Sequence, residues 1–265
     1  MHAFEYHRPS STKDALALGS KNEEARYLAG GQSLVQAMKL RLSSPSDLID
    51  LGTIKELAGI KASGSGVEIG AMTRHADVAG SKEVQKAIPA LAMLAGIIGD
   101  RQVRHMGTIG GSLANSDPAA DYPAAVLGLG ATITTNKRKI EADKFFKGLY
   151  ETALEPGELI TQVTFPAPKR AAYMKFKNPA SRFALVGVFV ADFGGNVRVG
   201  VTGAGPSAFR QAEMEKALAQ KFAPESVANI KVKADGLNND LHASPEYRAH
   251  LITVMAKRAV EAALK

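Results

Sequence analysis

One stretch, residues 106–123, constrains this chain more than any other, because it places three glycines within five positions and follows them with small polar and acidic residues. Its sequence is Met-Gly-Thr-Ile-Gly-Gly-Ser-Leu-Ala-Asn-Ser-Asp-Pro-Ala-Ala-Asp-Tyr-Pro. Glycine tolerates positive φ and lets another molecule approach the backbone closely. Successive N–H groups in such a loop can form an anion-binding concavity. On this stretch alone two interpretations stay open: a loop that cradles a phosphorylated cofactor, and a glycine-rich turn followed by a capped helix.

Another glycine-rich segment lies upstream at residues 29–34, with the sequence Ala-Gly-Gly-Gln-Ser-Leu. In chain order it is the first glycine segment, and residues 106–112 form the second. A short apolar stretch over residues 25–29 predicts a strand before it, and the apolar spacing over residues 34–41 predicts a helix after it. The N-terminus of a helix presents N–H groups without partners and the positive end of the helix dipole. The segment therefore predicts a second anion-binding site, with Ser33 as the expected N-cap.

The chain contains no cysteine. Disulfides and cysteine-ligated zinc or iron–sulfur clusters are therefore excluded for this chain. If it takes part in electron transfer, its own redox group must be organic, or the metal must lie on another subunit. The six histidines show no ligand spacing, and no triad or pair of carboxylates stands out. Neither a metal site nor catalytic side chains are predicted.

Charge and hydropathy narrow the range of partners. The net charge is +7, but the basic residues are scattered, with only residues 137–139 as a short run, and aromatic residues make up 6% of the chain, so no nucleic-acid surface is predicted. The longest apolar-rich run, residues 88–98, is too short to span a bilayer and contains Pro89, so no transmembrane segment is expected. The N-terminal residues lack the apolar core of a signal peptide, which predicts a cytoplasmic protein.

The order of the expected elements indicates an α+β fold. Helices are predicted near residue 12 and over residues 34–41, 73–79, 82–96, 122–129, 208–220, 224–228 and 246–264. Strands are predicted over residues 4–6, 25–29, 47–51, 60–62, 67–70, 131–135, 139–141, 158–165, 172–177, 184–193 and 196–203. The prolines at 166 and 168 mark the best candidate for a domain boundary. Three strands followed by helices beyond it indicate a separate, smaller α+β domain.

The two glycine segments occur in a known combination. An Ala-Gly-Gly-x-Ser loop at residues 29–33 precedes a Thr-Ile-Gly-Gly loop at 108–111, and the match continues through 112–121, through Lys175–Lys177 and through the Asp-Leu-His-Ala-Ser-Pro-Glu-Tyr-Arg segment at 240–248. With these motifs in this order, the chain resembles the FAD-binding medium subunit of the molybdenum hydroxylases, the family of carbon monoxide dehydrogenase and xanthine dehydrogenase. One departure is Gln32, because many carbon monoxide dehydrogenase-like members carry His at this position. The departure affects which member of the family the chain resembles most, and not the resemblance to the family.

The resemblance implies an architecture and a set of partners. It implies a PCMH-type FAD-binding domain over residues 1–168, built of two subdomains at about 1–55 and 56–168, and then a C-terminal domain over 169–265 with a three-stranded sheet and helices. It further implies a heteromeric oxidoreductase in which a large subunit holds the molybdenum cofactor and a small subunit holds two [2Fe–2S] clusters. Electrons would pass from the clusters to FAD on this chain, and then to an external acceptor such as NAD or a quinone.

The same resemblance implies which residues bind FAD. Two backbone loops would surround the pyrophosphate, and their residues are Ala29, Gly30, Gly31, Gln32, Ser33 and Leu34 in the first and Thr108, Ile109, Gly110, Gly111 and Ser112 in the second. Asp121 and Asn115 would accept hydrogen bonds from hydroxyl or amino groups of the adenosine half. Ile98 and Ile160 would pack near the cofactor. Lys177 would lie close to the flavin, stabilise negative charge on its reduced form and raise its potential.

Each of these assignments has a structural alternative. The glycines can simply permit a turn, and Asp121 can be the N-cap of the next helix. Ile98 and Ile160 can be ordinary core residues, and Lys177 can be a solvated lysine on an edge strand. For the function, the alternatives are a self-contained FAD-dependent oxidase, and a flavin-free nucleotide-binding or scaffold protein of the same fold. In the FAD interpretation no catalytic side chain is expected, because the flavin carries the chemistry.

Overall fold

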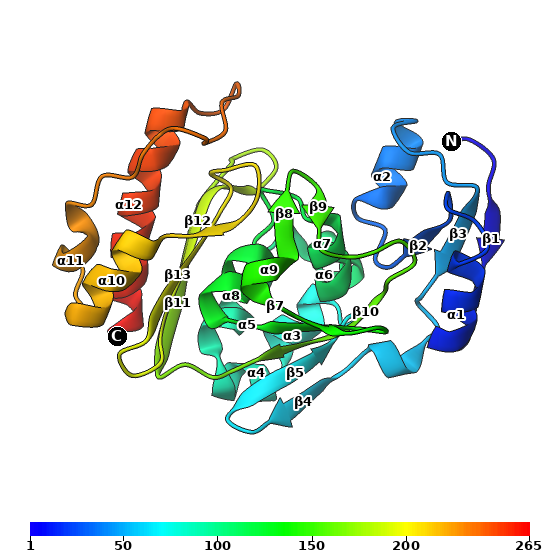
Figure 1. Cartoon of the computed structure of the whole chain (residues 1–265), viewed down its shortest axis with the longest axis horizontal. Helices are drawn as coiled ribbons and strands as arrows, with labels where there is room; N and C mark the ends of the chain where they lie inside the picture. The colour runs from blue at the N-terminus through cyan, green and yellow to red at the C-terminus, as the bar shows by residue number, and fades with distance from the viewer.

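The computed structural model describes residues 1–265, which form three main β-sheets arranged along the long axis of the molecule (Figure 1). A small parallel sheet lies at one end, a five-stranded sheet in the middle, and a four-stranded sheet at the other end, with helices around each. This mixture of helices and sheets confirms the α+β fold predicted from the sequence. None of the helices combines the length and the apolar character needed to cross a bilayer. The cytoplasmic location stays a prediction.

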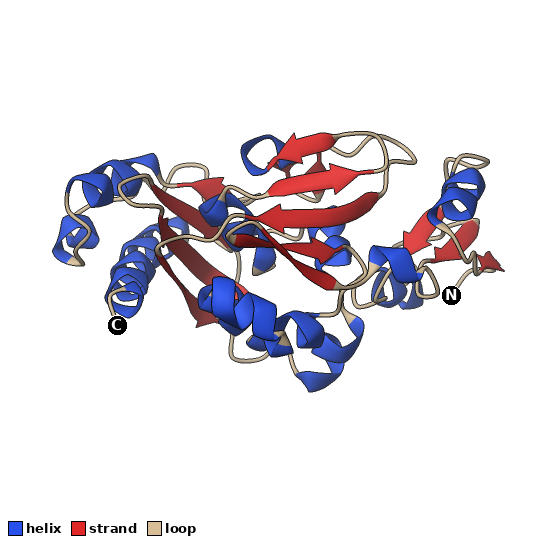
Figure 2. Ribbon diagram, turned by 90° about the horizontal axis from the view of Figure 1, so that it is seen from below, coloured by secondary structure: helices blue, strands red, loops and turns tan.

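The N-terminal unit is a parallel sheet in the order β1 (Glu5–His7), β3 (Asp47–Asp50) and β2 (Arg26–Leu28). Parallel neighbours cannot be joined by a tight hairpin and need a crossover. The helices α1 (Thr12–Gly19) and α2 (Leu34–Lys39) lie in the two crossovers. Figure 2 shows this unit set apart at one end of the molecule. The first glycine segment lies in the crossover from β2 to β3, directly before α2.

The central unit is an antiparallel sheet that carries a long helical insertion. Its strands, in spatial order, are β4 (Ile60–Ser63), β5 (Gly66–Gly70), β10 (Ile160–Phe165), β6 (Thr132–Thr135) and β7 (Lys139–Glu141). The insertion between β5 and β6 holds α3 (His75–Gly80), α4 (Lys82–Ala87), α5 (Pro89–Gly96), α6 (Arg101–Met106), α7 (Ile109–Asn115) and α8 (Tyr122–Leu129). The remaining short elements are η1 (Lys55–Leu57), α9 (Ala142–Phe145), β8 (Phe146–Gly148) and β9 (Glu151–Thr152). The second glycine segment therefore lies where α6 meets α7.

The single helix predicted over residues 82–96 is wrong, because the chain forms α4 and α5 instead. Ile88 leaves the helical region, with φ −145° and ψ 73°, and Pro89 occupies the first position of α5. Proline lacks the N–H that a helix interior requires, and its ring disfavours helical geometry at the residue before it. The apolar spacing continues across the break because both helices bury the same side against the central core.

The C-terminal unit is an antiparallel sheet of four strands, not the predicted three. Its strands are β11 (Arg170–Lys177), β12 (Ala184–Asp192), β13 (Val197–Thr202) and β14 (Phe209–Arg210), and its helices are α10 (Ala212–Gln220), α11 (Glu225–Ala228) and α12 (Pro245–Ala263). The missed strand, β14, has only two residues and lies within the range predicted as the start of a helix. Two residues are too few to show the alternation that predicts a strand.

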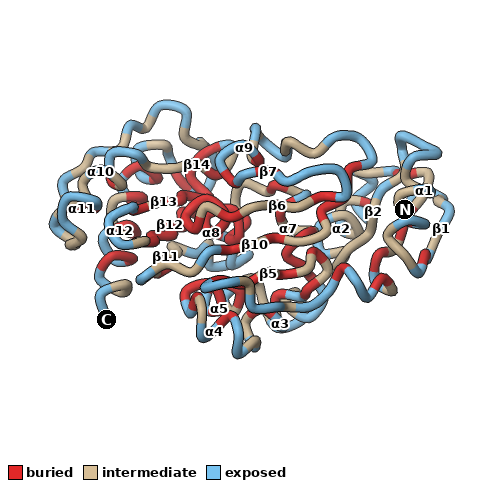
Figure 3. Tube along the Cα trace, turned by 60° about the horizontal axis from the view of Figure 1, so that its bottom comes forward, coloured by how far each residue is buried: buried red, intermediate tan, exposed pale blue.

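The C-terminal sheet shares a core with the rest of the chain. Every residue of β12 is buried, because helices cover both of its faces. Val188 and Val190 point into the C-terminal core with α12, whereas Phe189 and Ala191 point into the central core with α8. Figure 3 shows the buried segments gathered where α8, β12 and β13 meet. Because this core crosses residue 168, the predicted division of the chain into domains at that point stays a prediction.

Candidate functional site

A cavity of about 450 Å³ lies between the N-terminal and central units, and residues of both line it. The two glycine segments form part of its wall, although they lie far apart in the sequence. Of the predicted site residues, those that line the cavity are Ala29, Gly30, Gly31, Gln32, Ser33, Leu34, Ile98, Thr108, Gly110, Gly111, Ser112, Asn115, Asp121 and Ile160. Ile109 and Lys177 do not line it. Ile109 is fully buried in the central core, and Lys177 is exposed at the end of β11.

The two glycine segments touch each other at the cavity. A Cβ atom added to Gly30 would lie 2.1 Å from the backbone oxygen of Met106 and 2.7 Å from the Cα of Gly107. A Cβ added to Gly111 would lie 3.2 Å from the Cβ of Ala29. The closeness of these backbones requires glycine at Gly30, because no side chain fits between the segments. The interpretation of Gly30 as a residue that merely permits a turn is therefore incomplete.

The first glycine segment leaves an unbroken run of backbone donors without partners. None of the hydrogen bonds in the structure uses the backbone N–H of any residue from Ala29 to Gln36. Ser33, the predicted N-cap, precedes α2 but makes no capping hydrogen bond. Of these residues, Ala29 to Leu34 line the cavity. The N–H groups of Leu34 to Gln36 are the free donors of the first turn of α2, and those of Ala29 to Ser33 extend this row along the cavity, where it can bind an anionic acceptor.

The second glycine segment differs from the expected loop, because it is the capped first turn of α7. The hydroxyl of Thr108 accepts a hydrogen bond from the N–H of Gly111 at 3.1 Å. The N–H groups of Ile109 and Gly110 donate to backbone oxygens of Thr73 and Ala71, and that of Ser112 donates to Thr108. Within residues 107–112, only Thr108 keeps a free N–H. The expectation that both segments supply rows of N–H donors is therefore wrong for the second one.

Gly110 is explained by packing and not by a ligand. A Cβ added there would lie 2.5 Å from the Cβ of Ala71, and 2.8 Å from its backbone oxygen. Gly110 thus brings α7 against the segment that follows β5. The polar side chains that this helix turns to the cavity are Ser112 and Asn115, and neither makes a side-chain hydrogen bond within the chain. The second segment therefore closes the cavity and offers side-chain groups to a ligand.

Asp121 is held by two residues of the C-terminal sheet. It is 4% exposed. Its carboxylate accepts a hydrogen bond from the Tyr173 hydroxyl at 2.6 Å and forms an ion pair with the Lys175 ammonium at 3.0 Å. Burial raises the pKa of Asp121, and the ammonium of Lys175 and the Tyr173 hydroxyl act against that rise. Its side chain does not cap α8, so the structural alternative of an N-cap does not hold.

Lys175 joins three segments of the cavity wall. Besides its pair with Asp121, its ammonium donates to the backbone oxygen of Ile97 at 3.1 Å and to that of Arg182 at 3.0 Å. The neighbours Ile98 and Phe183 line the cavity beside these two residues. The lysine side chain is only 3% exposed. Lys175, and not the exposed Lys177, is therefore the lysine that the structure builds into this region.

Several cavity residues were not identified from the sequence. They are Arg26, Tyr27, Leu51, His75, Arg182 and Phe183 among the lining residues. Arg182 and Phe183 lie in the loop between β11 and β12, which contains no glycine and carries no motif. The signal that marks the loop in the structure is the positive φ of 63° at Arg182, which a sequence does not reveal. Arg26 and Tyr27 belong to β2, whose short length hides the alternation of its side chains.

His75 is a buried, uncharged histidine in the cavity wall. It is 5% exposed, its Nδ1 has no hydrogen-bond partner, and its ring centroid lies 5.3 Å from that of Tyr122. Burial, together with the positive charge of Arg104, lowers the pKa of His75 to about 4. The histidine is therefore neutral at pH 7.

We expect His75 to make the folded chain sensitive to acid. In the unfolded chain a histidine takes up its proton near pH 6.5, whereas in the folded chain it does so only near pH 4. Between these values the unfolded state binds more protons, so the free energy of unfolding falls as the pH falls, by about 3 kcal/mol in total. Urea unfolding of the wild type and of His75→Phe between pH 7 and pH 4 measures this component. Parallel pH profiles for the two proteins would contradict the assignment.

Comparison with known proteins agrees with this geometry. Residues 2–168 match the family described as "FAD binding domain in molybdopterin dehydrogenase". The chain is 37% identical to the carbon monoxide dehydrogenase medium chain of Hydrogenophaga pseudoflava, over 98% of this chain and 96% of that one. It is 35% identical to the glyceraldehyde dehydrogenase medium chain of Sulfolobus acidocaldarius, over 97% and 96%.

Solved structures show the same likeness. A chain of the Hydrogenophaga pseudoflava carbon monoxide dehydrogenase that lacks the Mo-pyranopterin moiety superposes with a TM-score of 0.91 at 38% identity, and the match covers 99% of this chain and 98% of that one. A chain of quinoline 2-oxidoreductase from Pseudomonas putida 86 also gives a TM-score of 0.91, at 29% identity, with 99% and 97% covered. Because the match to this family covers more than half of the chain, the chain belongs to the FAD-binding subunits of the molybdopterin dehydrogenases, a family of oxidoreductases.

Proposed function

We propose that this chain binds FAD in the cavity between its N-terminal and central units, as the flavin subunit of a heteromeric molybdenum-containing dehydrogenase or hydroxylase. The observation that carries the proposal is the run of free backbone N–H groups from Ala29 to Gln36, because residues 29–34 of this run line that cavity. FAD supplies the redox chemistry when it is bound. The work of the protein is then to bind, orient and shield the cofactor.

The residues that line the cavity fit the parts of FAD. The free N–H groups of the first glycine segment and of Thr108 suit a pyrophosphate, which carries two negative charges at neutral pH. Hydrogen bonds to a charged acceptor contribute roughly 1.5–3 kcal/mol each. Asp121 would repel a phosphate, so we assign it, with Asn115, to hydroxyl or amino groups away from the pyrophosphate. Ile98 and Ile160 offer apolar contact to a ring system.

The likeness to medium chains also supports partners for this chain. Two of the matched relatives are medium chains of dehydrogenases, and one structural relative is described as a chain of a Cu,Mo-containing carbon monoxide dehydrogenase. We propose a large subunit with the molybdenum cofactor and a small subunit with [2Fe–2S] clusters as partners, and NAD or a quinone as the external acceptor. The absence of cysteine in this chain means that such clusters must lie on a partner. Identifying the subunits that co-purify with the chain tests this part.

FAD binding can be measured directly on the purified full-length chain. We expect FAD to bind with quenching of its fluorescence. Riboflavin, which lacks the pyrophosphate, should bind at least about 100-fold more weakly, because the loss of two charge-assisted hydrogen bonds lowers the binding free energy enough for a change of this size. Equal affinities for the two flavins would contradict the role given to residues 29–36. A chain that binds neither flavin would refute the proposal and favour a flavin-free nucleotide-binding or scaffold protein. A chain that reduces its bound FAD with a substrate and no partner would instead be a self-contained oxidase.

A further inference from the structure

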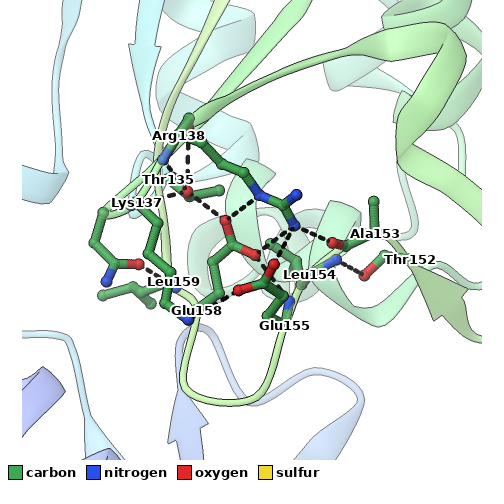
Figure 4. Close-up of polar contacts among 10 residues, drawn as sticks. Thr135, Lys137, Arg138, Thr152, Ala153, Leu154, Glu155, Glu158 and Leu159 are labelled. Atoms are coloured by element: carbon green, nitrogen blue, oxygen red, sulfur yellow. Dashed lines mark hydrogen bonds and ion pairs between the residues drawn. The ribbon is translucent and has the colours of Figure 1, made fainter.

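Glu158 is a buried carboxylate in the cavity wall whose hydrogen-bonding capacity is used entirely within the chain. Its side chain is 0% exposed. One carboxylate oxygen accepts from the Thr135 hydroxyl at 2.6 Å and from Arg138 Nε at 3.1 Å, and the other accepts from Arg138 Nη2 at 3.0 Å and from the backbone N–H of Glu155 at 2.8 Å (Figure 4). Burial alone would raise the pKa of Glu158, but these hydrogen bonds outweigh it and lower the pKa to about 2. Glu158 is therefore a charged group that serves to hold other residues.

The partners of Glu158 hold the loop before β10 at both of its ends. Arg138 also donates through Nη2 to the backbone oxygen of Ala153 at 2.7 Å, where the loop begins. Asn136 accepts from the N–H of Leu159 at 2.8 Å, and its own N–H donates to the backbone oxygen of Leu159 at 3.0 Å, where the loop ends. The tip of the β6–β7 hairpin, residues 135–138, thus fixes residues 153–159. None of the hairpin-tip residues lines the cavity.

The segment held in this way joins the two sides of the cavity. Leu154, Glu158, Leu159 and Ile160 all line it. Leu159 belongs to the central unit, yet its side chain is buried in the small core of the N-terminal unit, with Ile49 and other apolar residues. Leu159 is therefore one of the contacts that hold the N-terminal unit, with its free N–H groups, against the central unit, together with the contact between the two glycine segments. A shift of this loop changes the width of the cavity.

We propose that Arg138 and Glu158 form a positioning clamp that sets the spacing of the two halves of the cofactor cavity, and with it the affinity for FAD. The FAD part of this inference rests on the proposed function. Neither side chain is assigned a contact with the cofactor, because both carboxylate oxygens of Glu158 are engaged and Arg138 lies outside the cavity. The effect is transmitted through Leu159 and Ile160.

The decisive variant is Arg138→Met, because Arg138 is 43% exposed and lies outside the cavity, so that no cavity or core side chain is removed. The variant leaves the buried Glu158 without its counter-charge, so it should also lower the free energy of unfolding. We expect the Kd for FAD to rise about 10- to 100-fold, the range found when a group that orients metal ligands is removed, because Arg138 likewise acts by orienting residues of the site. Glu158→Gln should raise the Kd similarly, and the double variant should be no worse than either single one, because the two residues act as a unit. An unchanged Kd in Arg138→Met, with FAD bound normally by the wild type, would overturn the clamp and leave the proposed function intact.

A matched control separates the clamp from a general loss of stability. Glu215→Gln breaks a comparable pair, since Glu215 is 12% exposed, bonds to Arg210 at 2.7 Å and accepts the N–H of Val199 at 2.8 Å. Glu215 lies on α10 and does not line the cavity, so this variant should lower stability and leave the Kd for FAD unchanged. A rise in Kd equal to that of Arg138→Met would make the effect nonspecific and overturn the proposal.

A second readout does not require FAD. Without the cofactor, Arg138→Met should speed hydrogen exchange at the amides of the N-terminal sheet, β1 to β3, because Leu159 is no longer held in their core, and Glu215→Gln should not. If the wild type failed to bind FAD, this measurement would still test the clamp. Unchanged exchange in the N-terminal sheet would refute the positioning of that unit by Arg138 and Glu158.

Discussion

Replacing Lys175 by methionine is expected to lower the free energy of unfolding by about 3–5 kcal/mol, because it leaves the carboxylate of Asp121 buried without its counter-charge. Both side chains of this pair are 3% exposed, so water cannot replace the lost ammonium. The variant also frees the backbone oxygens of Ile97 and Arg182, which loosens two segments of the cavity wall. Urea unfolding at pH 7 measures the loss, and FAD titration measures its effect on the cavity.

Two further variants show whether the charge is responsible. In Lys175→Met with Asp121→Asn, the uncompensated charge is gone and the Tyr173 hydroxyl keeps an acceptor, so most of the stability should return. The single-variant loss should also shrink in acid, since a protonated Asp121 needs no counter-charge. A double variant no more stable than Lys175→Met would show that the lysine acts through packing and not through its pair with Asp121.

Lys177→Met is the matched control for this experiment. Lys177 is exposed at the end of β11, and we expect its replacement to change stability by less than about 0.5 kcal/mol. The resemblance also implied that Lys177 raises the flavin potential, and this stays a prediction. The same variant tests it, because a potential unchanged in Lys177→Met and lowered in Lys175→Met would transfer the role to Lys175.

Replacing Gly30 by alanine is expected to weaken FAD binding about 100-fold or more. The added Cβ would lie 2.1 Å from the backbone oxygen of Met106, so the first glycine segment must move away from the second. That movement displaces the free N–H groups of residues 29–36, and the loss of two charge-assisted hydrogen bonds accounts for a change of this size. Fluorescence titration with FAD gives the Kd.

The control for Gly30→Ala is Gly80→Ala, where an added Cβ meets no atom within 4 Å. This variant should bind FAD as the wild type does. Gly110 is the wrong place for the test, because its replacement would disturb the packing against Ala71 whether or not a cofactor binds. If Gly30→Ala kept the wild-type Kd, the contact between the two glycine segments would not define the site.

Much of the site was predictable from the sequence because its signals are local. Glycine and capping residues act through their own backbone and through neighbours a few positions away, so the segments at 29–34 and 108–112 were identified, and all their residues except Ile109 line the cavity. The strands of the central sheet and α8 were predicted for the same reason, since alternation and helical spacing are local patterns. The Pro89 break and the two-residue β14 were missed because the helical spacing continues across the break and β14 is too short for any pattern.

Local patterns in the sequence thus identify which segments form the cavity and which class of ligand suits them. The role of each segment in the cavity depends on contacts that form when the chain folds. The N–H groups of Ile109 and Gly110 are occupied by oxygens of Thr73 and Ala71, while those of residues 29–36 stay free, and Lys175 rather than Lys177 meets Asp121. The physical reason is that hydrogen-bond partners and counter-charges are supplied by residues far away in the chain, and a local pattern carries no information about which of them folding brings near.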